Sequence, residues 1–459
     1  MRKFIGDKGF YKRLFAVMIP VLIQNVITNF VSLLDNIMVG QVGTEPMSGV
    51  AIVNQLLFVF NLCVFATSAS AGIFTAQFFG KGDNDGIQKT FRLKLWFVLG
   101  VFAAALVVLL SFGETFIGLF LTEGEENLSL SATMDYAKDY LAVMYWGLLP
   151  FAVSQAYGST LRETGETVVP MRAGIAAVFV NLIFNYILIF GKLGAPALGV
   201  AGAAIATVIS RYVECLIIVI WAHAHGDRHP YMKNIYATLS VPAELTGRVI
   251  KMGFPLLLNE FLWSSGMTIL NQCYSTRGLE VVSACNISST VSNLFFCAFF
   301  AMGTTIAIII GQLLGAGQLE RAVDEDRKLI AFAVVLCAAV GGIMAVLAPD
   351  IPEIYNTTAS VKTLASSLIT VSAAMMPVNA FTNSCYFTLR SGGKTWITFA
   401  FDSAYVWALC IPTAFILSRF TAMAIIPMYV AVQSLELFKC IIGFVMLKKR
   451  AWVNNLVAE

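Results

Sequence analysis

Charged residues and histidines are scarce in this sequence. Only 12% of its 459 residues are Asp, Glu, Lys or Arg, and three are histidine, whereas soluble proteins carry about 25% charged residues. Hydrophobic residues make up 58% of the chain. This composition excludes a water-soluble protein and predicts an integral membrane protein. The formal net charge of +3 is too small to indicate a nucleic-acid partner.

Motifs of catalysis and metal binding are also missing. The chain contains no HExxH, GxSxG or P-loop pattern, so we do not expect an enzyme. Its nine cysteines lie in apolar stretches without CxxC spacing, which predicts small buried side chains. The three histidines share one polar stretch, which is either a metal site or, as we expect, an irregular solvated loop. No resident cofactor is predicted.

Twelve apolar segments are long enough to cross a membrane, at roughly 20 to 25 residues each. The first follows basic residues, but Pro20, Gln24 and Asn25 interrupt it and no small-residue cleavage site follows. We therefore interpret it as a membrane span and not as a signal peptide. The predicted spans are 14–39, 48–79, 95–121, 138–161, 171–191, 199–222, 250–276, 281–314, 329–348, 363–389, 395–417 and 422–447.

Lysine and arginine gather on one side of these spans. That side includes the basic residues before span 14–39, those after span 48–79 and those at 448–450. The opposite side also has an acidic loop at 122–135, and its few basic residues are Lys138, Lys192, Arg277, Lys362 and Arg419. Because cytoplasmic loops carry the excess of Lys and Arg, both termini are predicted to be cytoplasmic in a multi-pass cell-membrane protein.

The sequence contains an internal repeat. Segments of the two halves match at two offsets, 228 and 235 positions. The offset of 228 pairs 160–162 (TLR) with 388–390 (TLR). We predict two related six-helix halves, residues 1–222 and 250–459, joined by a cytoplasmic linker at 223–249. At an offset of 235 the identical pairs are Arg13 and Arg248, Pro20 and Pro255, Gln77 and Gln312, Gly80 and Gly315, and Gly82 and Gly317.

Three segments resemble the multidrug and toxic compound extrusion (MATE) transporters. They are 34–40 (LDNIMVG), 161–167 (LRETGET) followed by Pro170, and 198–207 (LGVAGAAIAT). The resemblance covers nearly the whole chain, and the three segments are specific only in combination. It implies an all-α membrane protein of two pseudo-symmetric six-helix lobes. It also implies alternation between outward-open and inward-open states, with protons or sodium ions exchanged for substrate.

Carboxylates inside the membrane are candidate functional groups, because an ionised one costs several kcal/mol there. Asp35 lies roughly 31 Å along the first helix, and Glu260 and Asp402 lie nearer the middle of their spans. The alternatives are an interfacial acid for Asp35 and structural acids for the other two. Other membrane charges are interpreted as structural pairs three residues apart, Arg211 with Glu214 and Glu436 with Lys439.

The family's amino-terminal cation site matches Asp35, Asn181, Asn185 and Thr207, with Ala203 offering a carbonyl. Asn181 and Asn185 are four residues apart and share a helix face, where they could also simply hydrogen-bond between helices. Sodium-binding members often have Asp where this chain has Asn185. The missing charge disfavours sodium, so we expect Asp35 to bind and release a proton.

The carboxy-terminal half departs from the family pattern as well. Asn379 stands where some sodium-coupled members have Asp. Glu260 and Asp402 remain, and we predict that they form a second protonation site or a counter-ion for a cationic substrate.

The predicted function is secondary active export of cationic lipophilic drugs in exchange for protons or Na+, by a monomer in the lipid bilayer. The 35 Phe and 17 Met residues could supply adaptable apolar walls for such compounds. The alternative is a lipid-linked saccharide flippase of the same superfamily, which would be expected to need a cationic cavity. The acids in the predicted spans argue against it. A channel suits two related halves with buried titratable groups less well than a carrier does.

Overall fold

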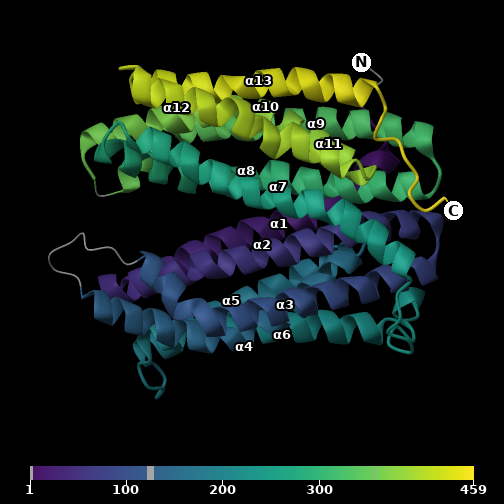
Figure 1. Cartoon of the computed structure of the whole chain (residues 1–459), viewed down its shortest axis with the longest axis horizontal. Helices are drawn as coiled ribbons and strands as arrows, with labels where there is room; N and C mark the ends of the chain where they lie inside the picture. The colour runs from purple at the N-terminus through teal and green to yellow at the C-terminus, as the bar shows by residue number, and fades with distance from the viewer. Residues whose placement is uncertain (1–3, 121–128, 356, 459) are drawn as a thin grey trace. The chain divides into compact units, whose positions relative to one another are not determined.

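The computed structural model describes residues 4–120, 129–355 and 357–458 (Figure 1). Within these ranges the chain is helical and contains no strand. Glu123, Glu125 and Glu126 of the predicted acidic loop lie outside the described residues. The long helices of the first half are α1 (Lys8–Gly40), α2 (Thr44–Lys81), α3 (Asn84–Phe120), α4 (Leu130–Glu163), α5 (Val168–Phe190) and α6 (Gly199–Ala224).

The second half follows the same order of long helices. A short helix, η1 (Pro230–Met232), precedes it, and η2 (Ile351–Ile354) lies between its third and fourth long helices. The helices are α7 (Ala243–Ser275), α8 (Leu279–Gly315), α9 (Leu319–Leu347), α10 (Ala359–Ser391), a segment made of α11 (Thr395–Phe399), η3 (Ala400–Ala404), η4 (Val406–Cys410) and α12 (Ile411–Phe420), and α13 (Ile425–Lys448).

Each of the twelve predicted spans therefore corresponds to one helix or, for 395–417, to one chain of helical pieces. Among the described residues, ten helical segments are long and apolar enough to cross a membrane. The other two, α4 and α7, have 34 and 33 residues, so their length is sufficient. Polar residues lower their hydropathy, and in α7 these include Asn259 and Glu260, which line a pocket described below.

Several helices begin earlier than the apolar pattern predicts. The first turns of α3 and α9 start at Asn84 and Leu319, about ten residues before the predicted spans 95–121 and 329–348. These turns are amphipathic and charged, so a search for apolar runs does not include them. Charged residues paired at i and i+4, such as Asp324 with Lys328, stabilise the first turns of the helix ahead of its apolar part.

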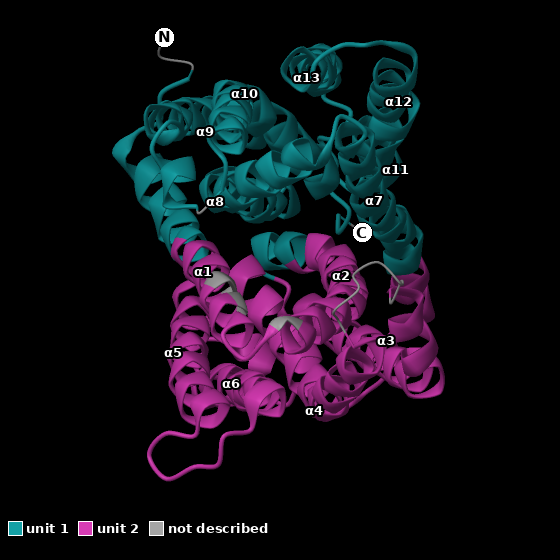
Figure 2. Cartoon of the chain, turned by 90° about the vertical axis from the view of Figure 1, so that its left-hand side faces the viewer, with its two compact units in different colours: residues 1–22, 76–82, 248–459 teal, residues 23–75, 83–247 magenta. Residues whose placement is uncertain are grey.

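The structure divides into two compact units (Figure 2). Unit 1 contains Met1–Leu22, Ala76–Gly82 and Arg248–Glu459, and unit 2 contains Ile23–Thr75 and Asp83–Gly247. The start of α1 and the end of α2 thus belong to the unit built by the second half of the chain.

Small residues allow close helix packing inside unit 2, where α6 packs against α4 and α5. A Cβ atom at Gly202 of α6 would lie 2.6 Å from the carbonyl oxygen of Leu188 in α5. Only glycine permits this approach of the two backbones. Gly202 belongs to the segment 198–207 that carries the family resemblance, and the close packing sets α5 beside α6 where the candidate site lies.

The repeat at an offset of 235 appears in unit 1 as two reciprocal backbone contacts. A Cβ at Gly80 would lie 1.8 Å from the carbonyl oxygen of Gln312, and a Cβ at Gly315 would lie 1.8 Å from that of Gln77. Gln77 and Gly80 match Gln312 and Gly315 in the repeat. The ends of α2 and α8 therefore cross in a pseudo-symmetric way, and each glycine makes room for the partner backbone.

The segment after α13 packs back onto unit 1. Trp452 and Val457 are buried, at 1% and 2% exposed. Gln77 donates to the carbonyl oxygens of Ser391 at 3.0 Å and Asn454 at 3.3 Å. The carboxy-terminal segment is consequently part of the unit's packing around the crossing of α2 and α8.

Between the end of α6 and the start of α7 the stretch 223–249 is irregular apart from η1, and most of its side chains are exposed, but part of it packs against the protein. His223 and the residue after it complete α6, and Tyr231, Met232 and Ile235 are almost fully buried. Arg92 of α3 donates to the carbonyl oxygen of Ile235 at 2.7 Å. Apolar side chains inside a polar stretch thus hold this segment against unit 2, a contact that charge and composition do not reveal.

Candidate coupling site and substrate pocket

The predicted amino-terminal site comes together in unit 2. Asp35 near the end of α1 meets Asn181 and Asn185 from one face of α5. Asn185 Nδ2 donates to Asp35 Oδ1 at 2.6 Å. Asn181 and Asn185 are 5% and 1% exposed, so both amides are buried, while Asp35 is partly buried. A carboxyl group with buried neutral hydrogen-bond partners is thereby held at a fixed place.

The Asn181 amide has two hydrogen-bonding orientations. In one, it accepts from Asn185 Nδ2 at 3.0 Å and donates to Thr207 Oγ1 at 3.3 Å. In the other, its nitrogen donates to Asp35 Oδ1 at 2.8 Å and its oxygen faces Thr207. The second orientation offers a carboxylate two N–H donors, and the first presents an amide oxygen that can accept from a carboxylic acid. The same residues therefore suit both protonation states of Asp35.

The predicted cation ligands also include an oxygen atom of Asn185 and the carbonyl oxygen of Ala203. Asn185 Oδ1 is buried and has no hydrogen-bond partner among the described residues, so it is a free acceptor. Ala203 is buried on α6, one turn before Thr207. The side chain of Asn185 nevertheless presents its nitrogen, and not its oxygen, to Asp35.

Sequence reasoning missed two polar residues beside this site. Tyr140 of α4 is 5% exposed and donates to Asn54 Oδ1 of α2 at 3.4 Å. It also lies close enough to interact electrostatically with Asp35. An aromatic residue in an apolar span carries no distinguishing sequence signal, so only the packing of α4 against α6 reveals it.

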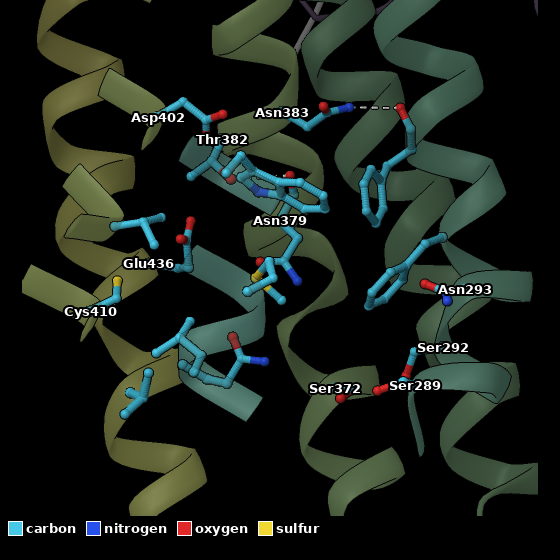
Figure 3. A pocket seen from close by; sticks show the side chains of 18 of the residues that line it. Ser289, Ser292, Asn293, Ser372, Asn379, Thr382, Asn383, Asp402, Cys410 and Glu436 are labelled. Atoms are coloured by element: carbon cyan, nitrogen blue, oxygen red, sulfur yellow. Dashed lines mark hydrogen bonds between the residues drawn. The ribbon is translucent and has the colours of Figure 1, made fainter. Parts of the chain in front are cut away.

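The predicted carboxy-terminal residues all line one pocket of unit 1, with a volume of about 430 Å³ (Figure 3). Glu260 comes from α7, Asn379 from α10 and Asp402 from η3. Asp402 and Glu436 lie on one side of the pocket in Figure 3, and Asn293 lies on the other. Aromatic side chains complete the wall, among them Trp263, Phe296, Phe300 and Phe387.

Asp402 is neutralised by a residue from another helix. Lys439 Nζ of α13 lies 2.9 Å from Asp402 Oδ1 and 3.6 Å from Glu436 Oε1. The predicted pair of Lys439 with Glu436 is present, but the shorter ion pair of Lys439 is with Asp402 in another helical segment. Asn259 Nδ2 donates to Asp402 Oδ2 at 3.1 Å, so both carboxylate oxygens of Asp402 have a partner.

The backbone around Asp402 departs from a regular α-helix. Residues 400–404 and 406–410 form two π-helical pieces between α11 and α12. Such wider turns are rare and concentrate at functional sites. Ser403 holds this stretch against α7, because its N–H donates to Asn259 Oδ1 at 3.2 Å and its hydroxyl donates to Asn259 O at 2.7 Å. The apolar run at 395–417 does not indicate this change of helical geometry.

Glu260 differs from Asp402 in its surroundings. No ion pair within 4 Å joins it to any residue in the described part of the chain, although Arg390 is near enough for its charge to act on Glu260. Arg390 lies over the ring of Phe387, 5.5 Å from the ring centre. Glu260 is thus a lining carboxylate that no lysine or arginine contacts directly.

Arg211 and Glu214 do not form the predicted pair within 4 Å in the described structure. Arg211 instead donates to the carbonyl oxygen of Gly147 at 3.2 Å and lies 5.0 Å from the centre of the Phe151 ring. The spacing of three residues permitted a pair along the helix, but contacts with α4 compete with it.

The repeated TLR motif positions a threonine against a buried charge in each unit. In unit 2, Lys94 is fully buried and pairs with Glu163, and it donates to Thr160 Oγ1 at 3.0 Å. In unit 1, Thr388 donates to Asp326 Oδ1 at 2.6 Å. Thr160 and Thr388 are the matching positions of the repeat. These contacts join neighbouring helices of each unit, and the spacing of the repeat alone does not predict them.

Comparison with known proteins agrees with this architecture. The family model MatE matches residues 20–187 and 255–416. The probable multidrug resistance protein NorM of Thermotoga maritima is 23% identical over 452 residues, covering 97% of this chain and 94% of that protein. The multidrug resistance protein MdtK of Edwardsiella ictaluri is 25% identical over 415 residues, covering 89% and 87%.

Solved structures share the fold. A MATE protein in a straight conformation superposes with a TM-score of 0.86 at 19% identity, covering 98% of this chain and 97% of that chain. An outward-facing multidrug resistance MATE transporter of the MOP superfamily gives a TM-score of 0.85 at 19% identity, with the same coverage. Because the family match includes both halves and most of the sequence, this protein belongs to the MATE family of membrane transporters.

Proposed function

We propose that this protein is a multidrug exporter of the plasma membrane that exchanges organic cations for protons by alternating access. The observation that carries the proposal is the pocket of unit 1, where Glu260 lines a cavity of about 430 Å³ and has no ion pair within 4 Å among the described residues. A carboxylate among aromatic rings attracts lipophilic cations by charge and by cation–π contact. The names of the relatives NorM and MdtK, which are multidrug resistance proteins, support drugs as substrates.

Coupling to protons is assigned to Asp35. Its contacts within the described structure are amide groups that accommodate both the acid and the carboxylate. Sodium prefers oxygen ligands with compensating negative charge. Asn185 turns its nitrogen toward Asp35, and this position carries an amide where sodium-binding members of the family often have a carboxylate. Protonation and deprotonation of Asp35 therefore fit the site better than sodium binding and release.

Transport into inverted membrane vesicles tests both the direction and the coupling ion. A radiolabelled lipophilic cation is added outside, and uptake is driven in turn by an inward-acidic proton gradient and by an inward-high sodium gradient. Uptake with the proton gradient alone is expected. Uptake with sodium alone, at equal pH on both sides, would contradict proton coupling but not export.

A lipid-linked saccharide flippase is the alternative function. Such a protein would need free cations in its cavity for a pyrophosphate group. The pocket contains Lys439 and Arg390, but Lys439 is held by Asp402 and Glu436. Arg390 lies over the ring of Phe387, 5.5 Å from the ring centre. The pairing of Lys439 with two acids favours drug export over the flippase.

A further inference from the structure

The ammonium group of Lys439 occupies a cage of acids and aromatic rings beside the pocket. It lies 2.9 Å from Asp402 Oδ1 and 3.6 Å from Glu436 Oε1. It also lies 5.4 Å from the centre of the Phe401 ring and 5.9 Å from that of Tyr405. Carboxylates together with ring faces are the groups that recognise an organic ammonium ion.

The cage is nearly closed and well supported. The side chains of Lys439, Asp402 and Glu436 are 7%, 18% and 16% exposed. Asn259 fixes the second oxygen of Asp402, and Ser403 in turn fixes Asn259. A lysine from the protein itself thus fills a position that is chemically suited to the cationic end of a ligand.

Among the described lining residues, the charged groups facing the pocket are the carboxylates of Glu260, Asp402 and Glu436 and the cations of Arg390 and Lys439. Lys439 binds two of the three carboxylates. Arg390 lies over the Phe387 ring and forms no ion pair within 4 Å with Glu260 in the described structure, which leaves Glu260 as the acid available to a ligand. The pocket therefore has room for one positive charge at Glu260 and already holds another at Lys439.

We propose that Lys439 is a specificity residue that restricts this pocket to substrates with a single positive charge. The proposal rests on the proposed function, in which Glu260 binds the cationic group of a substrate. A second cationic group on the same molecule would meet Lys439 instead of Asp402 and Glu436. Removal of the lysine ammonium opens the cage, so that a dication can satisfy Glu260 and the cage together.

Decylamine and 1,10-diaminodecane test the proposal, because they present one and two ammonium groups like that of Lys439 and stay protonated at neutral pH. Binding of both radiolabelled amines is measured with protein in lipid nanodiscs, with empty nanodiscs subtracted. Wild-type protein is expected to bind decylamine more tightly than the diamine. In Lys439→Ala, the ratio of diamine affinity to monoamine affinity should rise by about tenfold, which corresponds to about 1.4 kcal/mol.

Two variants control for charge and folding. Lys439→Arg keeps a cation in the cage and should retain the wild-type ratio. Lys439→Ala combined with Asp402→Asn removes the pair as a whole, which avoids an uncompensated buried charge and should remain folded. This double variant should gain much less diamine affinity than Lys439→Ala. Size-exclusion profiles and thermal unfolding confirm that each protein is intact.

The outcomes separate this inference from the proposed function. Equal binding of the two amines by wild-type protein overturns the role of Lys439, and this needs no variant. An unchanged ratio in intact Lys439→Ala also overturns it. If Glu260→Gln binds decylamine as well as wild type does, the assignment of Glu260 to substrate binding fails. In that case, a rise of the ratio of diamine affinity to monoamine affinity in Lys439→Ala would still show that the lysine excludes a second cation.

Discussion

Asp35 is the residue on which proton coupling depends. Asp35→Asn removes the titratable group while keeping a side chain of the same size, so the contacts with Asn181 and Asn185 are largely preserved. We expect this variant to fold and insert normally. Its rate of drug-for-proton exchange should fall by at least about 100-fold, because no other group replaces the Asp35 carboxyl as proton carrier. Drug-induced proton efflux from proteoliposomes measures the loss.

Asn185→Asp is the companion variant. It restores a second carboxylate beside Asp35, where the structure places an amide 2.6 Å from Asp35 Oδ1. Uptake by this variant should become stimulated by sodium, because the added charge compensates a bound cation. Full exchange by Asp35→Asn would refute the assignment of this residue, and sodium-driven transport by the wild type would refute the proton as coupling ion.

Glu260 is predicted to recognise the charge of the substrate. Glu260→Gln should reduce kcat/KM for cationic compounds by about tenfold or more and should affect neutral compounds of similar shape much less. Export from cells that accumulate a matched cationic and neutral dye measures the difference. Glu244→Gln, an exposed change in the first turn of the same helix, is the control. Equal losses for both dyes would leave Glu260 a coupling or structural role only.

At the scale of helices, the crossing of α2 and α8 depends on two glycines. The Cβ of an alanine at position 315 would lie 1.8 Å from the carbonyl oxygen of Gln77, so the two backbones would have to separate. We expect Gly315→Ala to destabilise the protein by about 1–3 kcal/mol, the usual cost of overpacking. A lower temperature of thermal unfolding in detergent is the measurement.

Gly342→Ala is the matched control for this crossing. Gly342 lies on α9 and has no atom within 4 Å of an added Cβ. The same substitution there should stabilise the helix slightly, by up to about 1 kcal/mol, because alanine has the higher helix propensity. A Gly315→Ala protein as stable as Gly342→Ala would show that the backbones at the crossing move apart without cost.

At the scale of the whole molecule, the orientation in the membrane remains a prediction from basic residues. In a variant without native cysteines, single cysteines at 125 and 355 should react with an impermeant thiol reagent on intact cells, whereas cysteines at 84 and 230 should not. Gln88 near the start of α3 donates to the carbonyl oxygen of Lys233 at 2.9 Å, so positions 84 and 230 belong to one end of unit 2. Labelling of position 84 from outside would reverse the orientation.

The sequence by itself determined the membrane class, the order of long helices and the repeat. These follow from the length of apolar runs, the placement of charges and identical residues at two fixed offsets, all of which are local or additive properties. The convergence of Asp35 with Asn181 and Asn185 was also predicted, but through family resemblance and not through spacing. Helix periodicity explains only that the two asparagines share one face.

Only the tertiary structure decided which charges meet. Lys439 pairs more closely with Asp402 than with Glu436 three residues before it, and Arg211 turns to Gly147 instead of Glu214. Spacing along one helix defines which side chains could touch, whereas the choice between partners depends on the distances and desolvation that packing of other helices imposes. The burial of Tyr231, Met232 and Ile235 after α6 and the wider helical turns around Asp402 have the same origin, because contacts between distant segments stabilise them.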